Sequence, residues 1–91
     1  MDDIREQKGR VLLDVYEAKQ RLEAAQRSHT ALVNRIAEFL ETFRTNPSAT
    51  LARGEKGIPT PHEIIETAKE LCDAQESLRS AEKKKAELGL A

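Results

Sequence analysis

The chain has 91 residues, of which 34% are charged, 38% are hydrophobic and only 3% are aromatic, with no tryptophan. This length and composition allow one small domain, exclude a large globular core and argue against a deep catalytic cleft. Fifteen basic residues against sixteen acidic ones give a net charge of −1, so the chain has no overall positive field to attract nucleic acid or an acidic membrane surface.

Three features of the sequence favour a soluble protein of the cytoplasm. Cys72 is the only cysteine, which excludes an intrachain disulfide and a zinc site built from cysteines. The first residues, MDDIRE, lack the basic start and the apolar stretch of a signal peptide. No apolar run approaches the roughly 18 residues that a membrane-spanning helix needs. We therefore expect a cytoplasmic location and no membrane contact.

Apolar residues in the first half of the chain recur in alternating steps of four and three, which is typical of one long helix whose seam faces another helix. The seam consists of Ile4, Lys8, Val11, Val15, Ala18, Leu22, Ala25, His29, Leu32, Ile36, Phe39 and Phe43. Asp3 can cap the start of this helix, and Pro47 stops it because the residue before a proline avoids helical geometry. The predicted helix covers residues 3–44.

Residues 45–60 contain two prolines and two glycines and show no helical period, so we expect a loop there. Such a loop is long for a connection between two helices, and long loops often carry binding functions. Three basic residues, Arg44, Arg53 and Lys56, make this end of the chain slightly positive. The loop is therefore either a flexible connector or a binding element that uses these three residues as contacts.

The second helix has a strong predicted start, with Thr60 as N-cap, Pro61 at the first helical position and Glu63 at the third. Its seam consists of Ile64, Thr67, Leu71, Ala74, Leu78, Ala81, Lys85 and Leu88. Acidic residues gather toward its start and basic residues, including the run Lys83–Lys85, toward its end, where each sign stabilises the helix dipole. The predicted range of this helix is 61–88.

Folded back on itself, the chain forms an antiparallel two-helix coiled-coil hairpin, the all-α fold that we expect for residues 1–91 as a single domain. The two seams match in size when Leu22 lies beside Ala81 and Val15 lies beside Leu88. In this register the second helix covers only the later part of the first helix.

The same register places His29 beside Gln75, midway along the hairpin. One hypothesis is a polar layer that fixes the register of the helices at some cost in stability. The alternative is a pH-sensitive layer, because a histidine can gain a charge on mild acidification and loosen the packing.

An apolar arm, residues 3–14, extends past the second helix in this register. A two-helix hairpin buries little apolar surface per residue, so self-association is the expected way to cover the arm and the other apolar edges. We expect a homo-oligomer, with a dimer favoured, that forms a larger helical bundle. The predicted contacts are Ile4, Val11, Leu12, Val15, Tyr16, Ile65 and Cys72, with Val33 and Leu40 as further apolar edges.

The sequence brings together no acid, base and nucleophile, so we predict neither a catalytic site nor a bound cofactor. His62 and Glu66 share a helix face but supply only two metal ligands, so no metal site is predicted either. The predicted function is a non-catalytic assembly or adaptor protein that binds protein partners through its helix faces. The alternative is a small nucleic-acid-associated regulator that uses the basic loop residues and the Lys83–Lys85 run.

Overall fold

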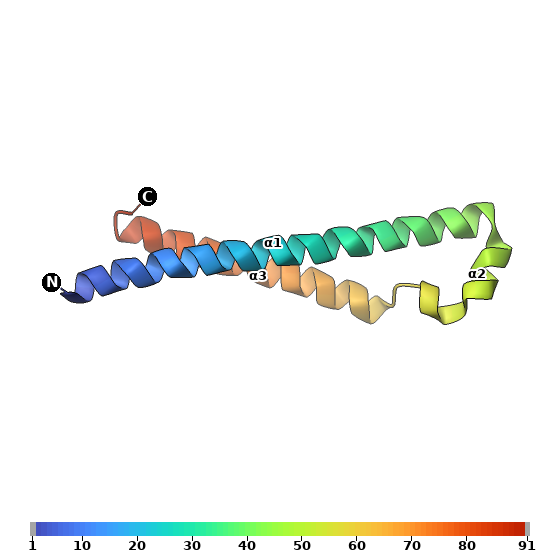
Figure 1. Cartoon of the computed structure of the whole chain (residues 1–91), viewed down its shortest axis with the longest axis horizontal. Helices are drawn as coiled ribbons and strands as arrows, with labels where there is room; N and C mark the ends of the chain where they lie inside the picture. The colour runs from blue at the N-terminus through green and yellow to red at the C-terminus, as the bar shows by residue number, and fades with distance from the viewer. Residues whose placement is uncertain (1, 91) are drawn as a thin grey trace.

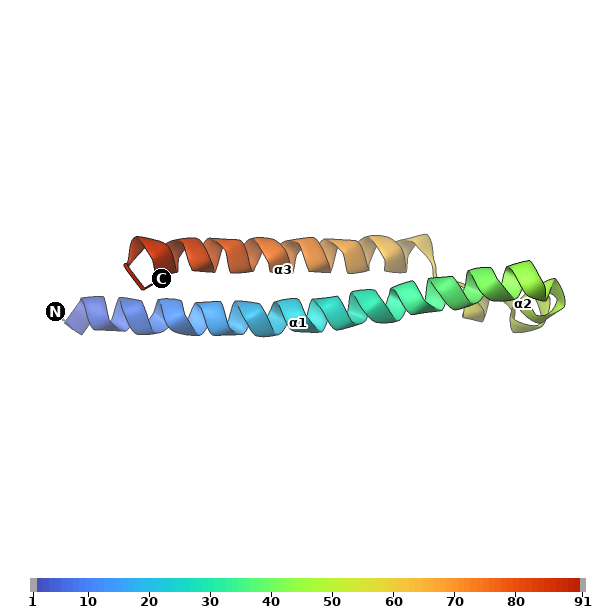
Figure 2. The ribbon, with the colours of Figure 1, turned by 90° about the horizontal axis from the view of Figure 1, so that it is seen from above.

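The computed structural model of this chain describes residues 2–90. They form three α-helices and one 3-10 helix: α1 (Asp2–Thr45), α2 (Pro47–Arg53), η1 (Gly54–Gly57) and α3 (Pro61–Glu87). The helices α1 and α3 lie side by side and run in opposite directions, with both ends of the chain at one end of the molecule (Figure 1, Figure 2). The predicted all-α class is confirmed for the part of the chain that is described.

The long helix α1 follows the predicted seam over most of its length. Its buried and half-buried residues include Val11, Val15, Ala18, Leu22, Ala25, Leu32, Ile36 and Phe39. These positions keep the alternation of three and four, interrupted only where His29 is exposed. The helix ends at Thr45, directly before Asn46 and Pro47.

The segment predicted as a loop, residues 45–60, folds instead as α2 and η1, so the described chain has three α-helices where two were expected. Asn46 caps α2 by accepting a hydrogen bond at Oδ1 from the backbone N–H of Ala49 (3.3 Å), and Pro47 occupies the first helical position. The sequence prediction treated Pro47 only as a stop, although a proline is also favoured at the first position of a new helix. Seven residues are too few to show a helical period, so the apolar pattern did not reveal α2.

Both ends of α3 are closed by local hydrogen bonds. The predicted cap is confirmed, because Thr60 Oγ1 accepts a hydrogen bond from the backbone N–H of Glu63 (3.1 Å). At the other end Gly89 has a φ of +70°, and the N–H of Leu90 donates to the carbonyl oxygen of Lys85 (3.0 Å). This left-handed glycine and its hydrogen bond form a Schellman motif, which fixes the end of α3.

The register of α3 against α1 differs from the predicted one by about one helical turn. Ala81 packs in a buried cluster with Val15 and Ala18, whereas the prediction placed it beside Leu22. A shift of one turn keeps seam residues opposite seam residues, so the apolar pattern alone cannot distinguish the two registers.

The shifted register shortens the uncovered arm. Val15 is buried against α3, and Val11 is half-buried where it lines a groove with Leu88. Both were predicted contacts of another copy; the structure places Val15 in the core of the α1–α3 pair and leaves Val11 half-exposed beside α3. The arm left uncovered by α3 therefore ends before Val11 and does not extend to residue 14.

The predicted polar layer is also corrected. His29 and Gln75 are both exposed, and no polar or charged side chain is buried within residues 3–90. The register shift moves Gln75 more than a turn along the axis from His29. A charge on His29 would therefore lie in solvent and would not disrupt the packing of α1 against α3.

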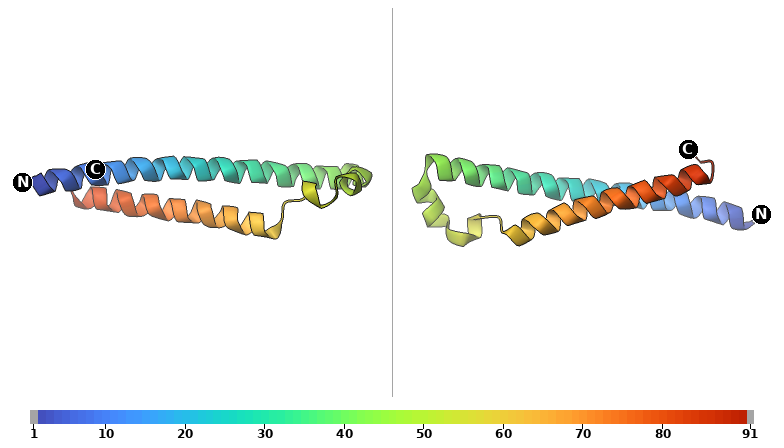
Figure 3. Two further views of the ribbon diagram at one scale, coloured as in Figure 1. Left: turned by 60° about the horizontal axis from the view of Figure 1, so that its bottom comes forward. Right: turned by 180° about the vertical axis from the view of Figure 1, so that it is seen from behind.

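Toward the end of the molecule that carries α2, the helices α1 and α3 diverge, and α2 and η1 cross the space between them (Figure 1, Figure 3). We call this end the tip. Here Phe39 stacks on Phe43 with ring centroids 6.2 Å apart. Phe39 also lines a small cavity with Thr50 and Ile58 of the connection. Side chains of the connection thus line a small cavity against α1 at the tip, whereas the buried core lies along the middle of the α1–α3 pair.

Candidate interaction surface

The core between α1 and α3 is small. Six hydrophobic residues of the described chain are buried: Val15, Ala18, Ala25, Leu32, Ala74 and Ala81. Four of them are alanines, which let two helices approach closely but remove little apolar surface from water. The larger seam residues, such as Leu22 and Leu71, are only half-buried.

The molecule consequently exposes far more surface than a compact protein of its size. Its accessible area is 7190 Å², whereas a globular protein of 10.2 kDa exposes about 5,300 Å². The radius of gyration is 20.0 Å, against about 12 Å expected for a compact chain of this length. The elongated shape, 69 × 18 × 14 Å, therefore leaves roughly 1,900 Å² of extra surface in contact with water.

Much of this surface is apolar. The large hydrophobic side chains that are exposed in the described residues are Ile4, Leu12, Leu13, Tyr16, Val33, Leu40, Phe43, Leu51, Ile58, Ile64 and Ile65. The structure thus leaves four of the predicted contacts open, namely Ile4, Leu12, Tyr16 and Ile65. Cys72, another predicted contact, is exposed as well.

Polar contacts between the two helices mark one side of the α1–α3 pair. Arg21 Nη1 donates a hydrogen bond to Ser77 Oγ (2.9 Å), and Arg35 Nη1 forms an ion pair with Glu63 Oε2 (3.0 Å). Successive residues of a helix are rotated by about 100°, which places further charged side chains on this same side. We call it the charged face; it carries Asp14, Glu17, Arg21, Arg35, Glu63, Glu66, Glu70, Asp73 and Lys84.

The opposite side of the pair has a different chemistry. Exposed residues that carry no charge occupy it over about four turns of helix, and we call this the apolar face: Gln26, Thr30, Val33, Ala37 and Leu40 of α1, with Ile64, Ala68, Cys72 and Gln75 of α3. Val33 is 47% exposed, whereas the preceding residue, Leu32, is 8% exposed and belongs to the core. The rotation of about 100° between the two residues takes Val33 from the core to the apolar face. Counting from Ala18 against Ala81, Val33 is level with Glu66, so the two segments lie side by side.

The apolar face could not be found from the sequence alone. Val33, Leu40 and Cys72 were recognised as apolar edges, but their alignment depends on the register of the helices, which the seams left undetermined. Ile64 was assigned to the seam, yet it is 42% exposed because α1 and α3 diverge toward the tip (Figure 1). The small residues Ala37 and Ala68 give no signal by themselves, since alanine is common throughout helices.

Two other exposed apolar residues extend the apolar face toward the free end of α1. Leu12 and Tyr16 are one turn apart and lie on the same side of α1 as Val33 by helical rotation. The charged residues Lys19 and Glu23 separate them from the nine residues of the apolar face. This side of the molecule therefore has two apolar parts, the apolar face and the pair Leu12 and Tyr16, with the charged residues Lys19 and Glu23 between them.

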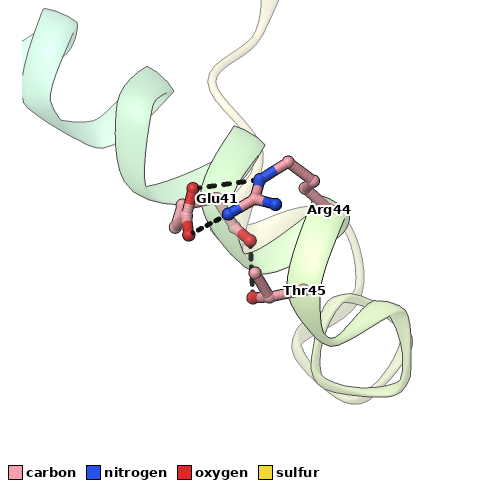
Figure 4. Close-up of polar contacts among 3 residues, drawn as sticks. All are labelled: Glu41, Arg44 and Thr45. Atoms are coloured by element: carbon pink, nitrogen blue, oxygen red, sulfur yellow. Dashed lines mark hydrogen bonds and ion pairs between the residues drawn. The ribbon is translucent and has the colours of Figure 1, made fainter.

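The basic residues at the tip do not form a concentrated positive patch. Arg44 is held by Glu41 through two contacts, Nη2 to Oε1 (2.7 Å) and Nε to Oε2 (3.4 Å), beside the bond from Thr45 Oγ1 to the Glu41 carbonyl oxygen (Figure 4). Both side chains are mostly exposed, so this is a surface ion pair that places a carboxylate directly beside the guanidinium group. Arg53 and Lys56 are exposed on α2 and η1.

The lysine run Lys83–Lys85 lies at the other end of the molecule. More than twenty residues of α3 separate it from the tip, a distance of roughly 35 Å along the helix. Lys83 and Lys84 are exposed, whereas Lys85 is half-buried, and the three side chains leave the helix in different directions. The structure therefore does not bring the two predicted basic elements together.

Within residues 3–90, no three His, Cys, Asp or Glu side chains are grouped so that they could hold a metal ion. His62 and Glu66 are both exposed in the first turns of α3. None of the helices in this range combines the length and the apolar character that crossing a membrane requires.

No protein family, curated protein or solved structure matches this chain.

Proposed function

We propose that this chain is a non-catalytic assembly or adaptor protein that binds other protein chains through its helix faces, a second copy of itself first among them. In this proposal the α1–α3 pair is an antiparallel coiled-coil hairpin, and two hairpins combine into a dimeric helical bundle. The observation that carries the proposal is the roughly 1,900 Å² of surface beyond that of a compact protein, on which large apolar side chains are exposed.

The physical reason is the hydrophobic effect acting on a chain with a small core. An alanine-rich contact between two helices provides little stabilisation, and small scaffolds of this kind usually gain stability from oligomerisation or another staple. The apolar side chains on α1 and α3 project from helices that are already formed, so covering them costs little additional backbone entropy. Association with another helical protein is the most direct way to remove this surface from water.

The alternative, a nucleic-acid-associated regulator, receives less support from the layout of the charges. The basic residues of the tip and the Lys83–Lys85 run lie at opposite ends of the long axis, and Arg44 is already paired with Glu41. Phosphate recognition depends on several cations acting on one stretch of backbone.

The mass of the protein in solution tests the proposal. We expect light scattering on the purified chain at about 100 µM to give twice the 10.2 kDa of one chain, a concentration at which micromolar self-association is complete. Elution volume alone does not suffice, because a chain with a radius of gyration of 20.0 Å elutes early even as a monomer. A mass of one chain at this concentration would contradict the proposal.

A further inference from the structure

We infer that the apolar face is where a second copy of this chain packs, related by a two-fold axis along the long axis of the molecule, so that α1 of each copy lies on α3 of the other. This inference rests on the proposed function and adds the surface, the occupant and the orientation. The resulting assembly is a four-helix bundle whose inner side is formed by the apolar faces of both copies.

Charge selects this face for a second copy. In a two-fold dimer each face meets its own duplicate, so the net charge of the face is repeated across the contact. The charged face carries six acidic and three basic residues, a net charge of −3, so pairing it with itself would bring together two surfaces of the same sign. The nine residues of the apolar face carry no charge, and the band beside them on α1 holds one cation and one anion, Lys19 and Glu23, so two copies can meet on this side without that repulsion.

The area available also fits a second copy. Residues 26–40 of α1 extend over about 21 Å, and two adjacent helices are about 20 Å wide. These dimensions give about 420 Å², about half of the roughly 800 Å² that a stable dimer takes from each partner. A contact that continues along α1 to Leu12 extends the length to about 42 Å and the area to about 840 Å². The chain has roughly 1,900 Å² of surface in excess of a compact protein, so it can lose this area and still resemble an ordinary soluble surface.

The position of Leu12 and Tyr16 determines the direction of the axis. With the axis along the molecule, every residue meets its partner at its own level, and Leu12 and Tyr16 are covered together with the apolar face. An axis across the molecule at Val33 would instead place Tyr16 of one copy opposite the level that lies 17 residues beyond Val33 in the other copy. The helix α1 ends before that level, at Thr45, so Leu12 and Tyr16 would find no partner there and would stay exposed to water.

A charge placed at Ala68 tests the face. Ala68→Arg puts two arginines into the proposed interface, and we expect the dimer to dissociate with a Kd at least about 100-fold higher than that of the parent. The matched control is Ala24→Arg, which places the same charge on an exposed alanine of α1 on the side of the charged face. We expect this control to keep the parent's mass, with equal helical content by circular dichroism in all three proteins.

The native thiol gives a second test that requires no change to the face. Cys72 lies on the apolar face, so its reaction with a soluble disulfide reagent should be at least about tenfold slower at protein concentrations where the dimer forms. The control is the pair Cys72→Ser with Ser80→Cys, which moves the thiol to an exposed position outside the face. Its reaction rate should be the same at low and high concentration.

The outcomes separate this inference from the proposed function. If the parent has the mass of a dimer but Ala68→Arg is still a dimer and Cys72 reacts equally fast at both concentrations, the second copy packs elsewhere and only the inference is wrong. A maximum dimension in solution far above the 69 Å of one chain would contradict the lengthwise axis. A parent with the mass of one chain would overturn both.

Discussion

Ala74 shows how the contact between α1 and α3 depends on single residues. Its side chain has 0% exposure, the lowest value in the core, while Ala68, two turns nearer the start of α3, is exposed. Two alanines of the same helix therefore have opposite environments, set only by the side of the helix on which they lie. A larger side chain at Ala74 has no room unless the two helices move apart.

We expect Ala74→Leu to lower the free energy of unfolding by about 1–3 kcal/mol, because overpacking a close helix contact forces the helices or the side chain out of their favoured geometry. Urea denaturation followed by circular dichroism measures this change. The matched control is Ala24→Leu at an exposed position of α1, where the change should stay within about 0.5 kcal/mol. Equal effects at the two positions would show that Ala74 is not at the contact.

At the level of elements, the ends of the helices are fixed by short local signals. Thr60 and Pro61 begin α3, Asn46 and Pro47 end α1 and begin α2, and Gly89 closes α3 in a left-handed conformation. Each signal acts through hydrogen bonds within a few residues, which is why most of these boundaries could be predicted from the sequence.

We expect Thr60→Ala to destabilise the protein by about 1 kcal/mol, because the N–H of Glu63 loses its hydrogen-bond acceptor. Thr60→Ser keeps the hydroxyl and should retain nearly all of the parent's stability. Thermal or urea unfolding of the three proteins side by side measures the difference. A serine variant as unstable as the alanine variant would contradict a capping role for the hydroxyl group.

The elements that were not predicted depend on longer-range information. The helix α2 was missed because Pro47 was interpreted only as a stop and because seven residues carry no period. The register was wrong by about a turn because two repeating seams match equally well after such a shift. The polar layer of His29 and Gln75 and the long apolar arm were both consequences of that register, so they failed with it.

On the scale of the whole molecule, two helices and a short connection produce a rod with one charged and one apolar side. The apolar face combines residues more than thirty positions apart, such as Val33 and Ala68, so it exists only once the register is known. The sequence could predict that apolar edges were left over; that another copy covers them stays a prediction. It could not place Val33, Leu40 and Ile64 on a common surface.

The central claim is that another copy of this chain completes the fold, and the dependence of the melting temperature on protein concentration tests it most directly. Dissociation accompanies the unfolding of a dimer, so raising the concentration shifts the equilibrium toward the folded state. With about 0.7 kcal/mol of unfolding enthalpy per residue, a hundredfold increase in concentration should raise the melting temperature by roughly 5–10 °C. A melting temperature that stays constant over this range, together with full reversibility, would contradict the claim.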